Sequence, residues 1–201
     1  MTAGDQAFEQ TLPVEVSGRI APGWWGMVVL ILTEAALFGT LLAGYFYLRA
    51  SSATWPQGGI KPPDPILPTI MTGILLASSI PMIWADWSIR RGRQQPMKMG
   101  LAIAFVLGAI FLGLQIYELT HETFAPSVNA YSSSFFTITC LHGLHVIAGL
   151  LMIAFTLTRA FLGHFNEHRN LAVTNTGLYW HFVDGVWVFV FLSLYVSPHV
   201  L

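Results

Sequence analysis

Five long apolar runs, separated by shorter polar segments, set the pattern of this chain. Each run has about 20 residues or more, which is the length that an α-helix needs to cross a hydrocarbon core of ~30 Å. The runs extend over about Trp24–Leu48, Ile66–Trp87, Met99–Leu119, Ser134–Arg159 and Thr174–Val196. Because a backbone in lipid must satisfy its own hydrogen bonds, we expect every run to be helical. The pattern predicts an all-α integral membrane bundle of five transmembrane helices over residues 23–201, preceded by a polar segment over residues 1–22.

The composition agrees with a membrane protein and excludes several other classes. The 201 residues are 54% hydrophobic and 9% charged, whereas soluble domains carry roughly 25% charged residues. The net charge is −1 and no basic run is present, so we expect no nucleic-acid partner. The single cysteine, Cys140, rules out an internal disulfide framework. Residues 1–22 do not show a charged segment followed by an apolar one, so we expect no cleaved signal peptide.

The distribution of cationic residues predicts how the helices are oriented. With five spans, the N-terminal segment and the loops after the second and fourth spans share one side of the membrane. That side holds seven of the nine lysines and arginines: Arg19, Arg90, Arg91, Arg93, Lys98, Arg159 and Arg169. The other side holds only Arg49 and Lys61. By the positive-inside rule, the N-terminus is cytoplasmic and the C-terminus lies outside.

Several polar side chains fall inside the predicted spans, where an unpartnered ionisable group costs several kcal/mol. They are Glu34, His142, His145, His181 and Asp184, with Gln115 and Glu118 nearer a helix edge. With a rise of ~1.5 Å per residue, Glu34, His142, His145 and Asp184 all fall in the middle third of the core, and His181 lies slightly nearer the cytoplasm. His181 and Asp184 are three residues apart and therefore share a helix face. The sequence thus predicts a buried polar layer.

Two interpretations of this layer stay open. The residues either bond one another and fix the helix register, or they handle protons or bind a ligand. For Asp184 the first is favoured, because His181 could satisfy it. For Glu34 we favour a functional role, as a protonated acid that is hydrogen-bonded to another helix and could share a proton with Asp184. A stripe of small residues beside it (Ala35, Gly39 and Ala43) should turn this face into the protein.

The histidines also raise the question of a metal or haem. A helical zinc site normally uses histidines four residues apart with a third ligand, whereas His142 and His145 are three apart. We therefore predict no metal site in this chain. A b-type haem would need one histidine from each of two helices, for example His145 with His181, and this membrane cytochrome remains an alternative.

Six patterns occur in a fixed order along the chain. They are Glu34 within its apolar run; Trp55-Pro56 with Gly59-Ile60; Leu76-Ala77-Ser78-Ser79; Gly108, Phe111, Gln115 and Glu118; Phe135-Phe136 and Thr139 before His142-Gly143-Leu144-His145-Val146; and Tyr179-Trp180-His181-Phe182-Val183-Asp184 with Val186-Trp187. Together they resemble subunit III of the haem–copper respiratory oxidases, the cytochrome c oxidase subunit 3 family. The last one is similar to the family pattern YWHFVDxVW. Among the departures, Gly185 stands where the family has a bulky apolar residue.

The long form of this family has seven helices, so the chain resembles the short, five-helix bacterial form that lacks the first pair. In the long form that pair encloses a cleft holding phospholipids, and phospholipid is the one ligand that the resemblance implies here. It also implies a multi-pass protein of the bacterial inner (cytoplasmic) membrane, with oxidase subunit I as principal partner and subunit II nearby.

The activity that the resemblance implies belongs to the complex. Subunit I carries the haems and copper and subunit II sets electron entry, so this chain would have no catalytic residues. It would support proton uptake on the cytoplasmic side and protect subunit I during turnover. Whether cytochrome c or quinol is the electron donor stays open. A similar five-helix protein accompanies nitric oxide reductases, which is the alternative complex.

Overall fold

The computed structural model describes residues 21–200, so the predicted polar segment over residues 1–22 lies almost entirely outside the described part. Five long helices follow one another in that part: α1 (Pro22–Ala50), α2 (Ile66–Ile89), α3 (Gln94–His121), α4 (Ala130–Phe161) and α5 (Leu171–Phe191). All five are long and apolar enough to cross a membrane. The predicted all-α bundle of five transmembrane helices is confirmed, while the side on which each terminus lies stays a prediction.

α3 and α4 begin before their apolar runs, and their first turns contain polar residues such as Gln94 and Ser132. α4 begins at Ala130, where the Asn129 side chain accepts a hydrogen bond from the backbone N–H of Ser132 at 2.9 Å. In return, the Ser132 hydroxyl accepts one from the backbone N–H of Asn129 at 3.1 Å. This reciprocal cap satisfies N–H groups that have no partner within the helix. At the other end of the chain, α5 continues through a π-helical turn (Leu192–Val196) into the short α6 (Ser197–Val200).

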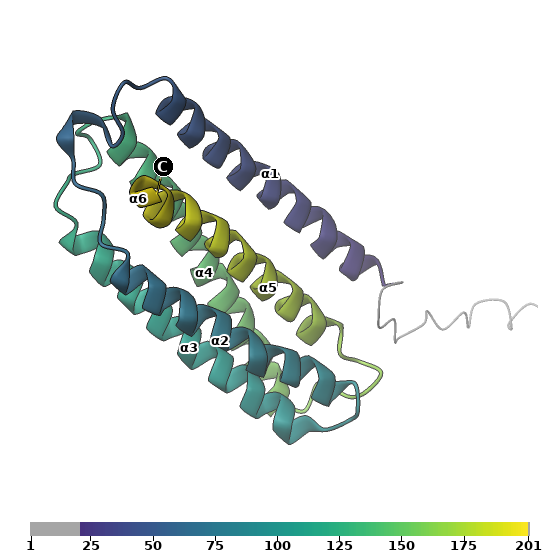
Figure 1. The fold of residues 1–201 in the computed structure, drawn as a ribbon. Coiled ribbons are helices and arrows are strands. Elements are labelled where there is room, and N and C mark those ends of the chain that lie inside the picture. The colour runs from purple at the N-terminus through teal and green to yellow at the C-terminus, as the bar shows by residue number, and fades with distance from the viewer. Residues whose placement is uncertain (1–20, 201) are drawn as a thin grey trace, which may run out of the picture.

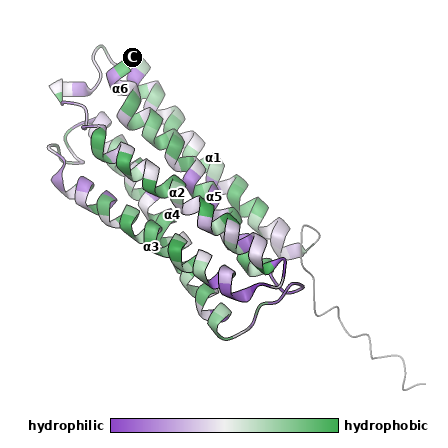
Figure 2. Cartoon of the chain, turned by 60° about the horizontal axis from the view of Figure 1, so that its bottom comes forward, coloured by the Kyte–Doolittle hydropathy of each residue, from purple (hydrophilic) through white to green (hydrophobic). Residues whose placement is uncertain are grey.

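Four helices form a ring, and the fifth lies outside it (Figure 1). In the ring, α2 packs on α3, α3 on α4, α4 on α5, and α5 on α2. α1 packs on α4 and α5, so α5 lies between α1 and α2 on one face of the molecule. Hydrophobic residues dominate the middle of the helices, and hydrophilic ones gather at the two ends and in the loops (Figure 2).

The centre of the ring is filled by the indole of Trp180 on α5. A Cβ added at Gly108 of α3 would lie 2.5 Å from Cη2 of this indole, and one added at Gly149 of α4 would lie 2.8 Å from its Cε3. Nε1 donates a hydrogen bond of 2.9 Å to Oγ of Ser78 on α2. One fully buried side chain therefore contacts the three other helices of the ring.

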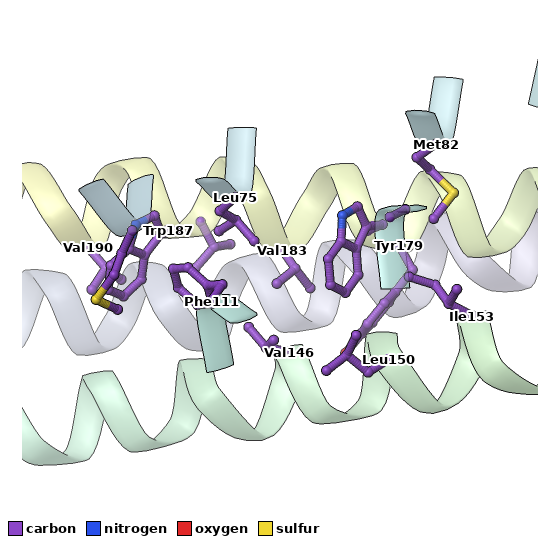
Figure 3. Packing of buried hydrophobic residues seen from close by; sticks show 14 of the residues in the cluster. Leu75, Met82, Phe111, Val146, Leu150, Ile153, Tyr179, Val183, Trp187 and Val190 are labelled. Atoms are coloured by element: carbon purple, nitrogen blue, oxygen red, sulfur yellow. The ribbon is translucent and has the colours of Figure 1, made fainter. Parts of the chain in front are cut away.

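Apolar side chains extend this core along α5. Figure 3 shows Val183 and Trp187 of α5 facing Phe111 of α3 and Val146 of α4. The rings of Phe111 and Trp187 meet edge to face, with centroids 4.9 Å apart. This is a geometry that aromatic pairs favour. Apolar side chains of α3, α4 and α5 thus continue the core of the ring beyond Trp180.

The small-residue stripe of α1 is exposed, and the prediction that it faces the protein is wrong. Ala35, Gly39 and Ala43 are all exposed, and a Cβ added at Gly39 would meet nothing within 4 Å. α1 instead buries Phe38 and Tyr45, two turns apart. The side of α1 that faces the bundle is therefore the one that carries its large side chains.

The packing around Trp180 predicts opposite effects for two glycines of α3. Gly108→Ala should destabilise the fold by about 1–3 kcal/mol, because the added methyl group meets the indole and overpacks the core. Gly113→Ala is the matched control, since Gly113 is exposed and an added Cβ meets nothing within 4 Å. Alanine is the better helix former, so this control should be neutral or slightly stabilising. Unfolding in detergent, followed by tryptophan fluorescence, measures both, and equal behaviour of the two variants would contradict the role given to Gly108.

Candidate functional site

Glu34 and His145 form a pair that joins α1 to α4. Oε2 of Glu34 lies 3.0 Å from Nε2 of His145, and the side chains are 26% and 13% exposed. The other ring nitrogen, Nδ1, lies 2.8 Å from the carbonyl oxygen of Leu141. A carbonyl only accepts, so Nδ1 carries hydrogen, and Nε2 carries one only if the ring is an imidazolium. The predicted hydrogen bond from Glu34 to another helix is therefore present, with His145 as the partner.

The proton of this pair has two neutral arrangements. Either a carboxylic acid donates to a neutral imidazole, or a carboxylate accepts from an imidazolium. Both carry no net charge, which suits an environment where an isolated charge is costly. Moving the proton between them needs no rotation of either side chain. The Glu34–His145 pair can therefore hold a proton within the span, and which form is present stays a prediction.

His142 does not join the pair, although it lies only three residues before His145. It is fully buried, with its ring centroid 4.9 Å from that of Trp187 and 6.0 Å from that of Phe111. Neither ring nitrogen finds a hydrogen-bond partner among residues 21–200. His142 packs here as an aromatic ring, so only one of the two predicted histidines of α4 takes part in a polar contact.

His181 and Asp184 are linked through Ser79 of α2 and do not bond each other directly. Nδ1 of His181 is 4.0 Å from Oδ2 of Asp184, which is too far for a hydrogen bond. The Ser79 hydroxyl donates to Asp184 Oδ2 and lies 2.9 Å from His181 Nδ1. A hydroxyl has one hydrogen, so His181 must donate to Ser79. The prediction of a direct bond is corrected, because a hydroxyl from the neighbouring helix fits the gap that the three-residue spacing leaves.

The predicted proton sharing between Glu34 and Asp184 is also wrong. Glu34 contacts His145 of α4, whereas Asp184 contacts Ser79 of α2. The expected single polar layer is instead two separate clusters, one on each side of α5. Sequence reasoning missed Ser79 as a member, although it lies in the Leu76-Ala77-Ser78-Ser79 pattern that carried part of the family resemblance.

Gln115 and Glu118 are buried in the structure and hold α3 against its neighbours. Nε2 of Gln115 donates to the carbonyl oxygen of Thr139 at 3.0 Å. Glu118 is 7% exposed and accepts a hydrogen bond of 3.1 Å from the Tyr195 hydroxyl. Just beyond α3, burial raises the pKa of Glu122, and a backbone hydrogen bond from Thr123 partly offsets this. A cavity of about 490 Å³ at this end is lined by both glutamates.

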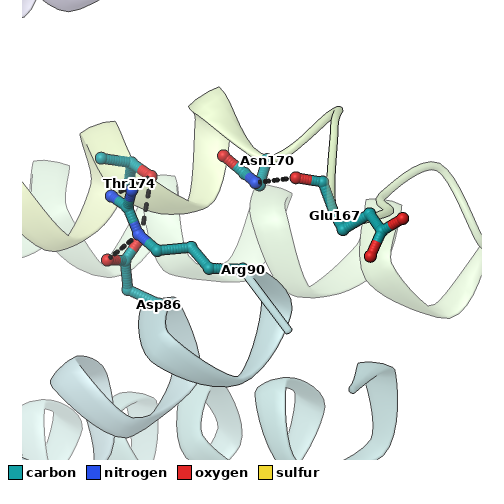
Figure 4. Close-up of polar contacts among 5 residues, drawn as sticks. All are labelled: Asp86, Arg90, Glu167, Asn170 and Thr174. Atoms are coloured by element: carbon teal, nitrogen blue, oxygen red, sulfur yellow. Dashed lines mark hydrogen bonds and ion pairs between the residues drawn. The ribbon is translucent and has the colours of Figure 1, made fainter. Parts of the chain in front are cut away.

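A polar cluster missed by sequence reasoning joins α2 to the start of α5 (Figure 4). Thr174 donates to Oδ1 of Asp86 at 2.7 Å, and Nε of Arg90 lies 2.8 Å from Oδ2 of the same carboxylate. Near the other end of the helix pair, Nε1 of Trp187 donates to Thr72 at 2.9 Å. With the Ser79 cluster, residues 72, 79 and 86 of α2 thus each meet α5 through a polar contact. The seven-residue spacing places these contacts on one face of α2.

A metal ion or a haem would need histidine, cysteine, aspartate or glutamate side chains that are arranged as ligands. Over residues 21–200, no group of three or more histidine, cysteine, aspartate or glutamate side chains is arranged to hold a metal ion. Both ring nitrogens of His145 already contact atoms of the chain. His181 is engaged with Ser79 of a different helix. These two histidines thus make separate contacts, one with Glu34 and the other with Ser79.

Removing the bridge should loosen the α2–α5 contact. Ser79→Ala leaves Asp184 buried without its donor, which should cost about 1–3 kcal/mol of unfolding free energy. Ser134→Ala is the control, because the Ser134 hydroxyl bonds only the carbonyl of Ala130 in its own helix. Thermal unfolding in detergent measures both variants. If Ser79→Ala is no less stable than Ser134→Ala, the bridge contributes nothing to the fold.

Comparison with known proteins places the chain in a family. The family model described as cytochrome c oxidase subunit III matches residues 7–198. The relative from Oryctolagus cuniculus is 36% identical over 181 residues, which cover 85% of this chain and 68% of the relative. The one from Thermostichus vulcanus is 34% identical over 172 residues, covering 85% of both chains. A third, from Latimeria chalumnae, is 37% identical over 191 residues, covering 92% of this chain and 71% of the relative. All three are named cytochrome c oxidase subunit 3, and the chain belongs to the cytochrome c oxidase subunit III family.

Proposed function

We propose that the chain is a non-redox accessory subunit of a haem–copper terminal oxidase in a bacterial cytoplasmic membrane. The observation that carries this proposal is the family match over nearly the whole chain. Its partners would be the oxidase subunits I and II. Haem and copper would belong to those partners, and phospholipid would cover apolar surfaces such as the outer face of α4.

Within this proposal, the Glu34–His145 pair is the part that handles protons. It lies between α1 and α4, and Glu34 keeps part of its side chain exposed. Moving the proton from one side chain to the other leaves the pair without net charge, so the pair can hold a proton between α1 and α4 at low electrostatic cost. It would support proton uptake by subunit I and stabilise that subunit during turnover. The predicted cytoplasmic N-terminus would place the Arg90 end of the bundle on the side from which protons are taken up.

Purification of the complex tests the proposed assembly. A tagged form of this chain, extracted in mild detergent, should co-purify with a haem–copper subunit that reduces oxygen. The chain purified alone should show no stoichiometric Soret band. A stoichiometric haem spectrum would make it a b-type cytochrome, and co-purification with a nitric oxide reductase would assign it to that complex.

Two substitutions of Glu34 test the pair. Glu34→Gln keeps the shape and the hydrogen bond, so the complex should assemble normally. Glu34→Ala leaves His145 without its partner, and the subunit should be held less stably by ~1–3 kcal/mol. Retention of the chain during stepwise detergent extraction of the complex measures the difference. Equal retention of the two variants would show that the contact between Glu34 and His145 does not stabilise the assembled complex.

Chemical labelling and infrared spectroscopy measure the protonation state of Glu34. A carbodiimide that attacks protonated buried carboxyl groups should label the wild type and fail to label Glu34→Gln at that position, as read by mass spectrometry. Glu118→Gln is the control, because it removes another buried carboxyl group and leaves Glu34 in place. If Glu34 stays unlabelled and infrared difference spectra show its carboxylate at pH 7, the ion-pair form is present and the protonated-acid hypothesis is wrong.

A further inference from the structure

A cavity at one end of the bundle is lined by three segments that lie far apart in the sequence. It forms where the connection from α1 to α2, the end of α3 and the short α6 meet, and Figure 1 shows these segments at the same end of the molecule. Its volume of about 490 Å³ is in the range of small-molecule sites. We call it the α3-end cavity. Its lining includes three carboxyl groups, those of Asp64, Glu118 and Glu122, and one lysine, Lys61.

Glu118 is the most buried of these carboxyl groups, and one of its oxygen atoms has no partner in the described chain. The residue is 7% exposed, whereas Glu122 is half-buried and Asp64 is exposed. The Tyr195 hydroxyl donates to Oε2 of Glu118 at 3.1 Å, and among residues 21–200 no hydrogen bond reaches Oε1. A buried acceptor without a donor costs free energy. Because Glu118 lines the cavity, a hydrogen-bond donor bound there would satisfy Oε1.

The two histidines of the cavity also present acceptors to it. Nδ1 of His121 lies 2.8 Å from the carbonyl oxygen of Tyr117, and Nε2 of His199 lies 3.1 Å from that of Pro63. A carbonyl only accepts, so each ring uses an N–H in this contact and, when neutral, keeps a lone pair on its other nitrogen. Together with the carboxyl groups, these lone pairs make the lining complementary to a hydrogen-bond donor that carries a positive charge.

An ammonium group on an alkyl chain fits this lining better than a metal ion. A metal ion needs several ligands that converge on one point, and over residues 21–200 no three histidine, cysteine, aspartate or glutamate side chains are arranged in that way. An ammonium group has three N–H donors and one positive charge, so it can bond acceptors that lie further apart. The connection from α1 to α2 adds Pro62, Pro63 and Pro65 to the lining, and their apolar rings suit contact with an alkyl chain.

We propose that the α3-end cavity binds an organic cation through an alkylammonium group, which lies between Glu118 and Glu122. These two glutamates are four residues apart, so their carboxyl groups lie on the same face at the end of α3. Neither forms an ion pair within residues 21–200, and Lys61, which is exposed, forms none there either. The described chain thus leaves the charge of the two carboxylates to a cation from outside it. The ammonium group belongs either to a free amine or to a lysine side chain of another polypeptide.

Titration of the full-length chain with n-butylammonium in mild detergent, followed by saturation-transfer NMR, tests the site. The wild type should bind this cation, and Glu122→Gln should bind it at least about tenfold more weakly, because one of the two carboxylates is lost. Glu167→Gln is the matched control, since Glu167 is an exposed glutamate in the connection between α4 and α5 and should leave the affinity unchanged. All three proteins should keep the same unfolding temperature. Equal affinity of Glu122→Gln and the wild type would overturn the proposal.

Two other ligands show whether the charge and the alkyl chain are both recognised. n-Butanol has the same alkyl chain without the charge and should show no saturable binding. Calcium ions have the charge without the alkyl chain and should bind more weakly than n-butylammonium. Tighter binding of calcium that is lost in Glu122→Gln would make the cavity a metal site, and saturable binding of butanol would make it an apolar one. Either result would overturn the proposal.

Cross-linking in the intact complex distinguishes the two sources of the ammonium group. A carbodiimide joins a carboxylate directly to an amine that contacts it. A cross-link from Glu122 to another polypeptide, absent in Glu122→Gln, would identify the bound group as a lysine side chain. Binding of n-butylammonium to the complex without such a cross-link would show that the cavity takes a free amine. If the complex shows neither the cross-link nor the binding, the cavity is not an ammonium site.

Discussion

The insertion of Trp180 between Gly108 and Gly149 is the contact on which the rest of the bundle depends. The indole fills space that exists only because α3 and α4 have no side chain at those positions. Its Nε1–H is satisfied by Ser78 of α2, so a polar group at the centre of the ring carries no penalty. Size complementarity and one hydrogen bond thus fix the relative depth of four helices at once.

This core contact also positions the polar cluster at the surface of the ring. Trp180 precedes His181, and Ser78 precedes Ser79. Successive residues of a helix point about 100° apart, because a turn takes 3.6 residues. When Trp180 and Ser78 meet inside the ring, His181 and Ser79 therefore meet at its edge. The hydrogen bond that Ser79 donates to Asp184 therefore follows from the packing of the indole.

α1 is attached in a different way, and this explains its exposure. It lies outside the ring and reaches it through Phe38, Tyr45 and the pair of Glu34 with His145. Arg49, at the end of α1, adds a hydrogen bond of 2.6 Å to Ser197. α1 contacts the ring along one side only, so the small residues on its other side stay exposed in this chain.

The number of helices, their approximate positions and the family were determined by the sequence alone, because hydropathy over about 20 residues and linear motifs are local properties. The residues of the site, such as Glu34, His145 and Asp184, also stood out locally, since polar groups are rare within spans. Their partners were decided only by the tertiary structure. The bond of Glu34 to His145, the bridge through Ser79 and the outward turn of Ala35 and Gly39 depend on how each helix is rotated and shifted against its neighbours. Those rotations follow from how large side chains such as Trp180 fit between helices. Because the helices are far apart in the sequence, no local pattern specifies this fit.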